Sequence, residues 1–119
     1  MNTLMINSQD QLRFIEKSDV VYCKSDNCYT TVYLNTSEEF VVCRSLTKIF
    51  NDLNDEQFIR TSRSYIVNRS YIKLIDKKKK VIVVNGDKLL PFTLSINDLL
   101  TLLGHGAATV FFIISMFMI

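Results

Sequence analysis

Residues 58–68 read Phe58-Ile59-Arg60-Thr61-Ser62-Arg63-Ser64-Tyr65-Ile66-Val67-Asn68, and this stretch decides how the rest of the chain is interpreted. The planar guanidinium of Arg63 suits a guanine edge or a phosphate. Thr61, Ser62 and Ser64 can donate to phosphate oxygens. Asn68 suits a phosphate, an adenine edge or a local turn. A core strand would not carry so many donors at adjacent positions, so we interpret the stretch as a segment that faces a ligand.

The distribution of charge predicts one basic face. The formal net charge of +2 is by itself weak evidence for a polyanionic partner. Residues 60–80, however, contain eight basic residues and one acidic residue, a balance of +7, whereas residues 1–59 contain nine acidic and five basic residues, a balance of −4. Such asymmetry is typical of a nucleic-acid-binding surface on an otherwise ordinary domain. The four lysines at 77–80 are interpreted more simply, as a solvated turn that precedes a strand.

Composition indicates one globular, non-enzymatic domain. The 119 residues suffice for one hydrophobic core, and 48% apolar residues argue against disorder. Three cysteines, an odd number, indicate reduced thiols, and we expect Cys23 and Cys43 to be buried in strands. His105 lies far from them, so we expect no zinc site and no other cofactor. The chain lacks a Ser-His-Asp set and a glycine-rich phosphate loop, which excludes the common enzyme classes.

Periodicity predicts a mostly β single domain with two short helices. Alternating or β-branched residues predict strands at 11–16, 19–23, 29–34, 39–44, 58–60, 71–75, 80–84 and 88–90. Turns are expected at 24–27, at 35–37 and at Asn85-Gly86. Ser45 and Ser95 are placed as helix N-caps, ahead of leucine-rich segments with helical spacing at 46–53 and 99–103.

Several short motifs occur in an order that resembles the LytTR DNA-binding domain, and the similarity runs from about residue 12 to residue 103 of this chain. They are Val20-Val21-Tyr22, Asp26-Asn27-Cys28-Tyr29, Arg44-Ser45-Leu46 and the 58–68 stretch. The resemblance implies an elongated arrangement of small antiparallel sheets, with one short inserted helix and a C-terminal helix. It also implies a cytoplasmic bacterial transcription regulator, the output domain of a two-component response regulator, whose loops enter successive major grooves of double-stranded DNA.

On this resemblance we predict eight DNA-binding residues: Arg63, Ser62, Thr61, Arg60, Asn68, Ser64, Asn27 and Lys24. The chain also departs from the family pattern. Ser62 replaces the usual histidine, Leu94 replaces the usual arginine, and Asp26 in a DNA-facing loop would repel phosphate. The departures at Ser62 and Leu94, together with the apolar C-terminal tail, motivate an alternative hypothesis, a degenerate LytTR-like domain that acts as a protein-interaction or membrane-tethered regulatory module. A second copy of the chain, bound on direct repeats, is a further partner to test.

The chain divides into a domain at residues 10–103 and an apolar tail at residues 104–119. Because the strands begin near the start, we expect no phosphoacceptor receiver domain before the motif. A membrane-spanning helix needs roughly 20 apolar residues. Residues 99–119 reach that length, but Gly104-His105-Gly106 interrupts them. We therefore hold two hypotheses for the tail, contact with a membrane or a membrane protein, and a truncated reading frame.

Overall fold

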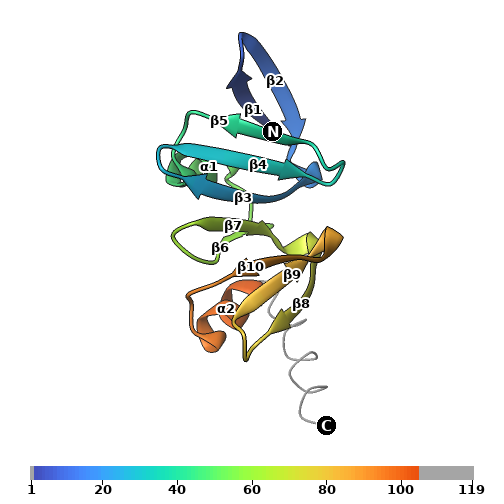
Figure 1. Ribbon diagram of the computed structural model, residues 1–119, viewed down its shortest axis with the longest axis vertical. Helices are drawn as coiled ribbons and strands as arrows, with labels where there is room; N and C mark the ends of the chain where they lie inside the picture. Colours follow the sequence, from blue (N-terminus) through green and yellow to red (C-terminus); the bar gives the residue numbers. More distant parts are fainter. Residues whose placement is uncertain (1, 105–119) are drawn as a thin grey trace.

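The computed structural model describes residues 2–104, which form ten strands and two α-helices (Figure 1). The strands are β1 Thr3–Ser8, β2 Gln11–Glu16, β3 Val20–Asp26, β4 Tyr29–Leu34, β5 Glu39–Val42, β6 Phe58–Arg60, β7 Tyr65–Asn68, β8 Ile72–Asp76, β9 Val81–Val84 and β10 Lys88–Pro91. The helices are α1 Leu46–Leu53 and α2 Ile96–Leu103, and short 3-10 turns occupy Lys17–Asp19, Arg69–Tyr71 and Asn85–Asp87. The predicted fold class, mostly β with one inserted and one C-terminal helix, is confirmed.

Three small antiparallel sheets follow one another along the long axis of the molecule (Figure 1). The first is the hairpin of β1 and β2, the second has the strand order β5-β4-β3-β7-β6, and the third has the order β10-β9-β8. The molecule measures 54 × 28 × 23 Å, so the predicted elongated arrangement is observed.

The five-stranded sheet separates two hydrophobic cores. One face packs against α1 and the β1–β2 hairpin, through buried residues that include Ile6, Ile49 and Leu53. The other face packs against the three-stranded sheet and α2, through buried residues that include Ile82 and Leu99. The central strands supply side chains to both cores, and this explains their nearly continuous apolar sequence.

Within residues 58–68 the predicted strand at 58–60 is observed as β6, but the interpretation of the stretch as a ligand-facing segment missed strand β7. Val67 pairs with Tyr22 of β3 and with Ile59 of β6, so β7 lies inside the sheet. Ile66 contacts the first core and Val67 the second. The polar donors are concentrated in the loop before β7, and for this reason the stretch did not look like a strand. Strand β1 was also not predicted, although Leu4 and Ile6 alternate toward the first core.

The β3–β4 hairpin is tighter than predicted. Lys24 and Ser25 were assigned to the turn, but they pair with Thr31 and Thr30 and belong to β3. The turn itself contains Asn27, whose φ of 57° lies in the left-handed region that asparagine tolerates better than most residues. The polar side chains of the strand end face solvent while their backbone remains paired, so side-chain polarity alone misplaced the boundary.

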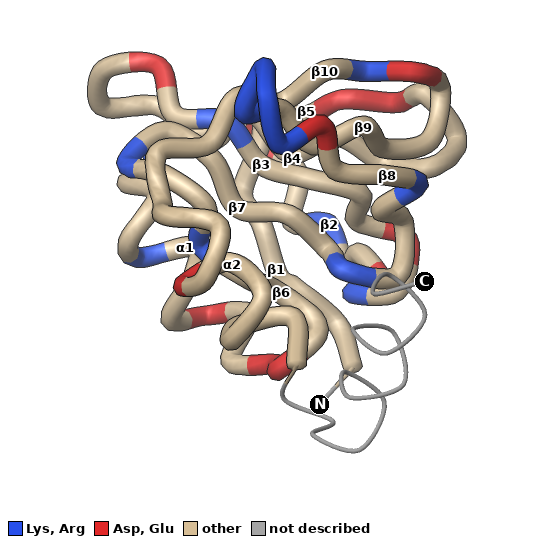
Figure 2. The backbone as a smooth tube through the Cα atoms, turned by 90° about the horizontal axis from the view of Figure 1, so that it is seen from below, with Lys and Arg blue, Asp and Glu red and all other residues tan. Residues whose placement is uncertain are grey.

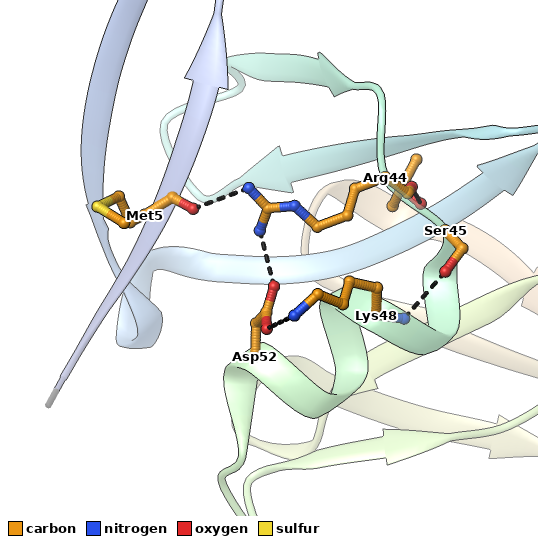
Figure 3. Close-up of polar contacts among 6 residues, drawn as sticks. Met5, Arg44, Ser45, Lys48 and Asp52 are labelled. Atoms are coloured by element: carbon orange, nitrogen blue, oxygen red, sulfur yellow. Dashed lines mark hydrogen bonds and ion pairs between the residues drawn. The ribbon is translucent and has the colours of Figure 1, made fainter.

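Arg44 joins the N-terminal hairpin to α1 (Figure 3). Its guanidinium donates to Asp52 Oδ2 of α1 at 2.9 Å and to the backbone oxygen of Met5 in β1 at 3.2 Å. Lys48 contacts the second oxygen of Asp52 at 3.0 Å. Ser45 caps the helix as predicted, because its Oγ accepts the N–H of Lys48 at 3.1 Å. One arginine therefore links β1 to α1, two elements that are distant in sequence.

The remaining predicted turns and caps agree with the structure. The β9–β10 turn contains Gly86 with a φ of 80°, a conformation that glycine adopts without strain. Ser95 caps α2 by accepting the N–H of Asp98 at 3.1 Å. Within residues 2–104 no helix is long and apolar enough to cross a membrane. The hypotheses about the apolar tail concern residues that, apart from Gly104, lie outside the described part of the chain.

The cysteines divide into one buried and two exposed thiols. Cys23 is fully buried in β3, as predicted, and burial raises the pKa of its thiol to about 12. The prediction that Cys43 is buried was wrong, because β5 ends at Val42 and Cys43 is exposed in the following bend. Cys28 is exposed in the β3–β4 turn.

We predict that Arg44→Ala lowers the free energy of unfolding by about 1–3 kcal/mol, because it removes a partly buried ion pair with Asp52 and a charge-assisted hydrogen bond to the Met5 oxygen. Lys48→Ala is the matched control. It removes only an exposed ion pair between residues four apart in α1 and should cost less than about 0.5 kcal/mol. Urea unfolding followed by circular dichroism measures both values, and equal effects would contradict the assigned role of Arg44.

We predict that iodoacetamide adds two groups to the native protein, at Cys28 and Cys43, and three groups to the unfolded protein. Burial raises the pKa of Cys23 from 9.0 to about 12, so its thiol stays neutral in the folded state. The free energy of unfolding should consequently fall as the pH rises from about 9 toward about 12, since the unfolded chain loses that proton first. Mass spectrometry counts the adducts, and rapid native labelling of Cys23 would refute its burial.

Candidate nucleic-acid interface

The donor-rich part of residues 58–68 forms the loop between β6 and β7. The backbone N–H of Thr61 donates to the oxygen of Tyr65 at 3.2 Å and closes the loop. Inside it, the N–H of Ser64 donates to Ser62 Oγ at 3.1 Å. Arg63 and Ser64 are exposed and Ser62 is half-buried. The loop therefore presents one arginine and two serines to solvent on a closed backbone.

Two further connections lie beside this loop. The N–H of Ser25, at the end of β3, donates to the oxygen of Ser64 at 2.9 Å. The N–H of Thr93, between β10 and α2, donates to the oxygen of Thr61 at 3.2 Å. The β3–β4 hairpin end, the β6–β7 loop and the β10–α2 connection thus lie in a row, at the left in Figure 1. We call this row, residues 24–28, 61–64 and 92–95, the loop edge.

The loop edge brings together four of the predicted residues with exposed side chains, Lys24, Asn27, Arg63 and Ser64. Among residues 2–104 the basic partners in ion pairs are Arg44, Lys48 and Lys73. The exposed charges of Lys24 and Arg63 therefore remain available to a partner. Asp26, at the hairpin end, adds one negative charge to the same edge. The edge can therefore attract an anionic partner, and its donors can bond to phosphate or base edges.

The lysine turn at residues 77–80 adjoins the loop edge. The N–H of Phe92 donates to the oxygen of Lys80 at 3.1 Å, and Lys80 Nζ lies 5.3 Å from the centroid of the Phe92 ring. Figure 2 shows the four lysines as one continuous blue segment between β8 and β9. The sequence predicts a solvated turn for these lysines, and Lys77, Lys78 and Lys79 are exposed. Their run of positive charge could have indicated a part of the basic surface. Their position beside Phe92, however, depends on the tertiary fold.

Thr61 and Asn68 do not belong to the exposed set. Thr61 has no exposed surface, and its hydroxyl has no hydrogen-bond partner among the described residues. Asn68 is 2% exposed, donates to the oxygen of Val20 at 2.9 Å and accepts the N–H of Ser70 at 2.9 Å. Of the three roles considered for Asn68, the local turn fits this position. Because a buried side chain cannot reach a base or a phosphate, we remove both residues from the proposed contacts.

Neither Arg60, which directly precedes residues 61–64 of the loop edge, nor Leu94, which lies in it, presents a free side-chain donor to solvent. The guanidinium of Arg60 is half-buried and bonds to the backbone of the β6–β7 loop. Leu94 is half-buried against the second core. The position at which the sequence pattern led us to expect an arginine therefore lies on the same edge as Arg63 and carries an apolar side chain.

Four tyrosines, Tyr22, Tyr33, Tyr65 and Tyr71, belong to the second core or pack against it, whereas Tyr29 is exposed at the start of β4. Tyr22 stacks on Tyr33 with 4.3 Å between ring centroids, and Tyr65 lies 6.3 Å from Tyr22. Burial raises the pKa of the Tyr22 hydroxyl to about 12, with further contributions from the neighbouring tyrosines and Glu39. Because Tyr22 is buried, its ring is not available for stacking on a base.

Comparison with known proteins identifies the same kind of domain. Residues 10–104 match the LytTr DNA-binding domain family. The transcriptional regulatory protein NatR of Bacillus subtilis is 30% identical over 70 residues, which cover 59% of this chain and 30% of NatR. The transcriptional regulatory protein LytR of Staphylococcus aureus (strain N315) is 26% identical over 91 residues, which cover 73% of this chain and 37% of LytR. The chain spans about a third of the length of these curated relatives.

A solved structure has the same fold. A LytTr DNA-binding domain from Bacillus cereus superimposes with a TM-score of 0.73 at 23% sequence identity, and the match covers 87% of this chain and 98% of that one. At this level of identity the likeness concerns the arrangement of strands and helices. It agrees with the three small sheets and two helices described above.

We predict that Asn68→Ala lowers the free energy of unfolding by about 1–3 kcal/mol, because it leaves the buried Val20 carbonyl without its donor. At a temperature where the variant stays folded, its Kd for duplex DNA should equal that of the wild type. The control Asn51→Ala alters an exposed asparagine of α1 and should change neither value. A stable Asn68→Ala protein with weakened DNA binding would restore Asn68 as a contact.

Proposed function

The chain belongs to the LytTR DNA-binding domain family, and from this we propose that it binds double-stranded DNA sequence-specifically through the loop edge, as part of a transcription regulator. The family resemblance inferred from the motifs is thereby confirmed. DNA binding and transcription regulation are the properties of the family and of its named relatives. The finer elements of the proposal are the residues that contact DNA and the entry of loops into successive major grooves.

The observation that carries the proposal is the alignment of three connections by two backbone hydrogen bonds, Ser25 to Ser64 and Thr93 to Thr61. The row runs across strands of the central sheet and continues to the β10–α2 connection along the long axis of the molecule (Figure 1). A major groove is about 12 Å wide and admits protruding protein elements. An elongated domain with loops along one edge can present different loops to neighbouring segments of one duplex.

We assign distinct tasks to the exposed residues of this edge. Arg63 has the planar fork that bonds bidentately to guanine or grips a phosphate, and it is our proposed base reader. Lys24 supplies charge for phosphate, and Asn27, Ser62 and Ser64 supply neutral donors that set register on the backbone. Asp26 would repel a phosphate. We therefore expect the end of the β3–β4 hairpin to approach base edges that carry donor groups, rather than the phosphate backbone of the DNA.

The alternative function is a protein-interaction or membrane-tethered module that has lost DNA recognition. One observation favours it, because Leu94 places an apolar side chain on the loop edge where the resembled pattern has an arginine. The two functions differ in a measurable way. A sequence-specific DNA-binding domain selects one sequence from a pool of random duplexes, and its affinity falls as the salt concentration rises. A module without DNA recognition does neither.

We predict that Arg63→Ala weakens binding to the selected duplex by about 1–3 kcal/mol, because a bidentate base contact is lost. Arg13→Ala is the matched control. Arg13 is an exposed arginine of β2, outside the loop edge, so its removal makes the same change in net charge. Fluorescence anisotropy with the full chain measures both Kd values. Equal affinities of the two variants, with folds intact by circular dichroism, would contradict the assignment of Arg63.

The selected sequence also tests the assembly. Two copies on direct repeats would give a duplex with two similar half-sites and a stoichiometry of two chains per duplex. Analytical ultracentrifugation of the complex measures that stoichiometry. A single short site with one bound chain would instead show that the chain recognises DNA as a monomer.

A further inference from the structure

Arg60 makes three hydrogen bonds, each to a different residue. Its Nε donates to the backbone oxygen of Ser62 at 3.3 Å, and one terminal nitrogen donates to the backbone oxygen of Arg63 at 3.0 Å. The other terminal nitrogen donates to Thr47 Oγ1 of α1 at 2.8 Å. The two carbonyls belong to the turn of the β6–β7 loop. The Arg60 guanidinium therefore binds the backbone of this turn on its inner, protein-facing side.

We propose that Arg60 is a positioning residue, which holds the backbone of Ser62 and Arg63 in the geometry that recognises DNA and anchors it to α1 through Thr47. The inference rests on the proposed function. It replaces the prediction that Arg60 itself contacts DNA. An arginine is needed because its planar group offers several donors at fixed angles, whereas a lysine offers one compact charge.

Residues 62–64 contribute no apolar side chain to either core. The other hydrogen bonds of the loop run from the Thr61 N–H to the Tyr65 oxygen, from the Ser64 N–H to Ser62 Oγ and from the Ser25 N–H to the Ser64 oxygen. Arg60 adds the two bonds to the backbone oxygens of Ser62 and Arg63 in the turn itself. A loop that must be ordered on binding loses affinity in proportion to the freedom it gives up. By holding two successive carbonyls, Arg60 orders the loop before DNA arrives.

Thr47 is a fixed anchor because α1 is itself well held. Ser45 caps the helix one residue before its first turn, and Leu46 and Ile49 are buried in the first core. The Thr47 hydroxyl is exposed and uncharged, so it can be altered without changing the net charge or the core. The Arg60 guanidinium therefore connects α1 to the β6–β7 loop through hydrogen bonds.

Four variants of the full chain separate positioning from direct contact. Arg60→Lys keeps the charge but loses the fork, and Thr47→Val keeps Arg60 but removes its anchor. Thr47→Ser keeps the hydroxyl and serves as the rescue variant. Arg13→Lys and Thr101→Val are matched controls on exposed residues outside the loop edge. The fourth variant, Arg60→Lys with Thr47→Val, tests whether the two residues act as one unit.

We predict that Arg60→Lys and Thr47→Val each bind the selected duplex about tenfold more weakly, because each leaves the loop to be ordered on binding. The double variant should be no weaker than Arg60→Lys, and Thr47→Ser and both controls should bind like the wild type. A phosphate contact by Arg60 gives another result, with Arg60→Lys close to wild type and Thr47→Val unaffected. That result would overturn the proposal.

Amide hydrogen exchange of the free protein supplies a second readout that does not depend on DNA. We expect faster exchange at the N–H groups of Ser25 and Ser64 in Arg60→Lys and Thr47→Val, since both groups bond to loop atoms. Unchanged exchange at both positions would refute the positioning role even if DNA affinity fell. If the wild-type chain enriches no duplex sequence, the proposed DNA reading fails, while exchange still decides whether Arg60 orders the loop.

Discussion

The structure depends on the burial of both faces of β7. This strand lies between β3 and β6, with Ile66 in one core and Val67 in the other, and neither has any exposed surface. A shift of one residue in its register would exchange the two faces and misplace both side chains. The constraint reaches β3 as well, where an irregularity between Val20 and Tyr22 lets the successive residues Val21 and Tyr22 face the same core, while Val20 and Cys23 face the other.

The candidate interface is a consequence of that register. Because β7 is held in place, the loop that precedes it ends at a defined point beside the end of β3, and the bond from Ser25 to Ser64 records this alignment. The bond from Thr93 to Thr61 adds the connection that leads into α2. Packing of the two cores thus determines which three loops share an edge. Residues 24–28 and 61–64 contribute no apolar side chain to either core, whereas the β10–α2 connection contributes Phe92 and Leu94 to the second core.

Polar residues of the 58–68 stretch divide into three roles that their chemistry alone does not distinguish. Asn68 bonds inward to the carbonyl of Val20 and belongs to the interior. Arg60 bonds sideways to the loop backbone and to Thr47. Arg63 extends into solvent. The two arginines have the same donors, and the difference between them is whether backbone carbonyls and a hydroxyl lie within reach. Burial makes an unpaired donor costly, as it is at the Thr61 hydroxyl, whereas an exposed donor remains available to a ligand.

The sequence by itself determined the local structure and the kind of chemistry. Period-two alternation, the N-caps Ser45 and Ser95 and the glycine of the β9–β10 turn are local signals, because each acts within a few residues. The excess of basic residues and the motif order likewise indicated a DNA-binding domain. Only the tertiary structure decided that Tyr65–Asn68 is a central strand, that Cys43 is exposed, and which donors face outward. The reason is that these outcomes depend on partners far along the chain, such as Val20 for Asn68, Thr47 for Arg60 and Thr93 for Thr61.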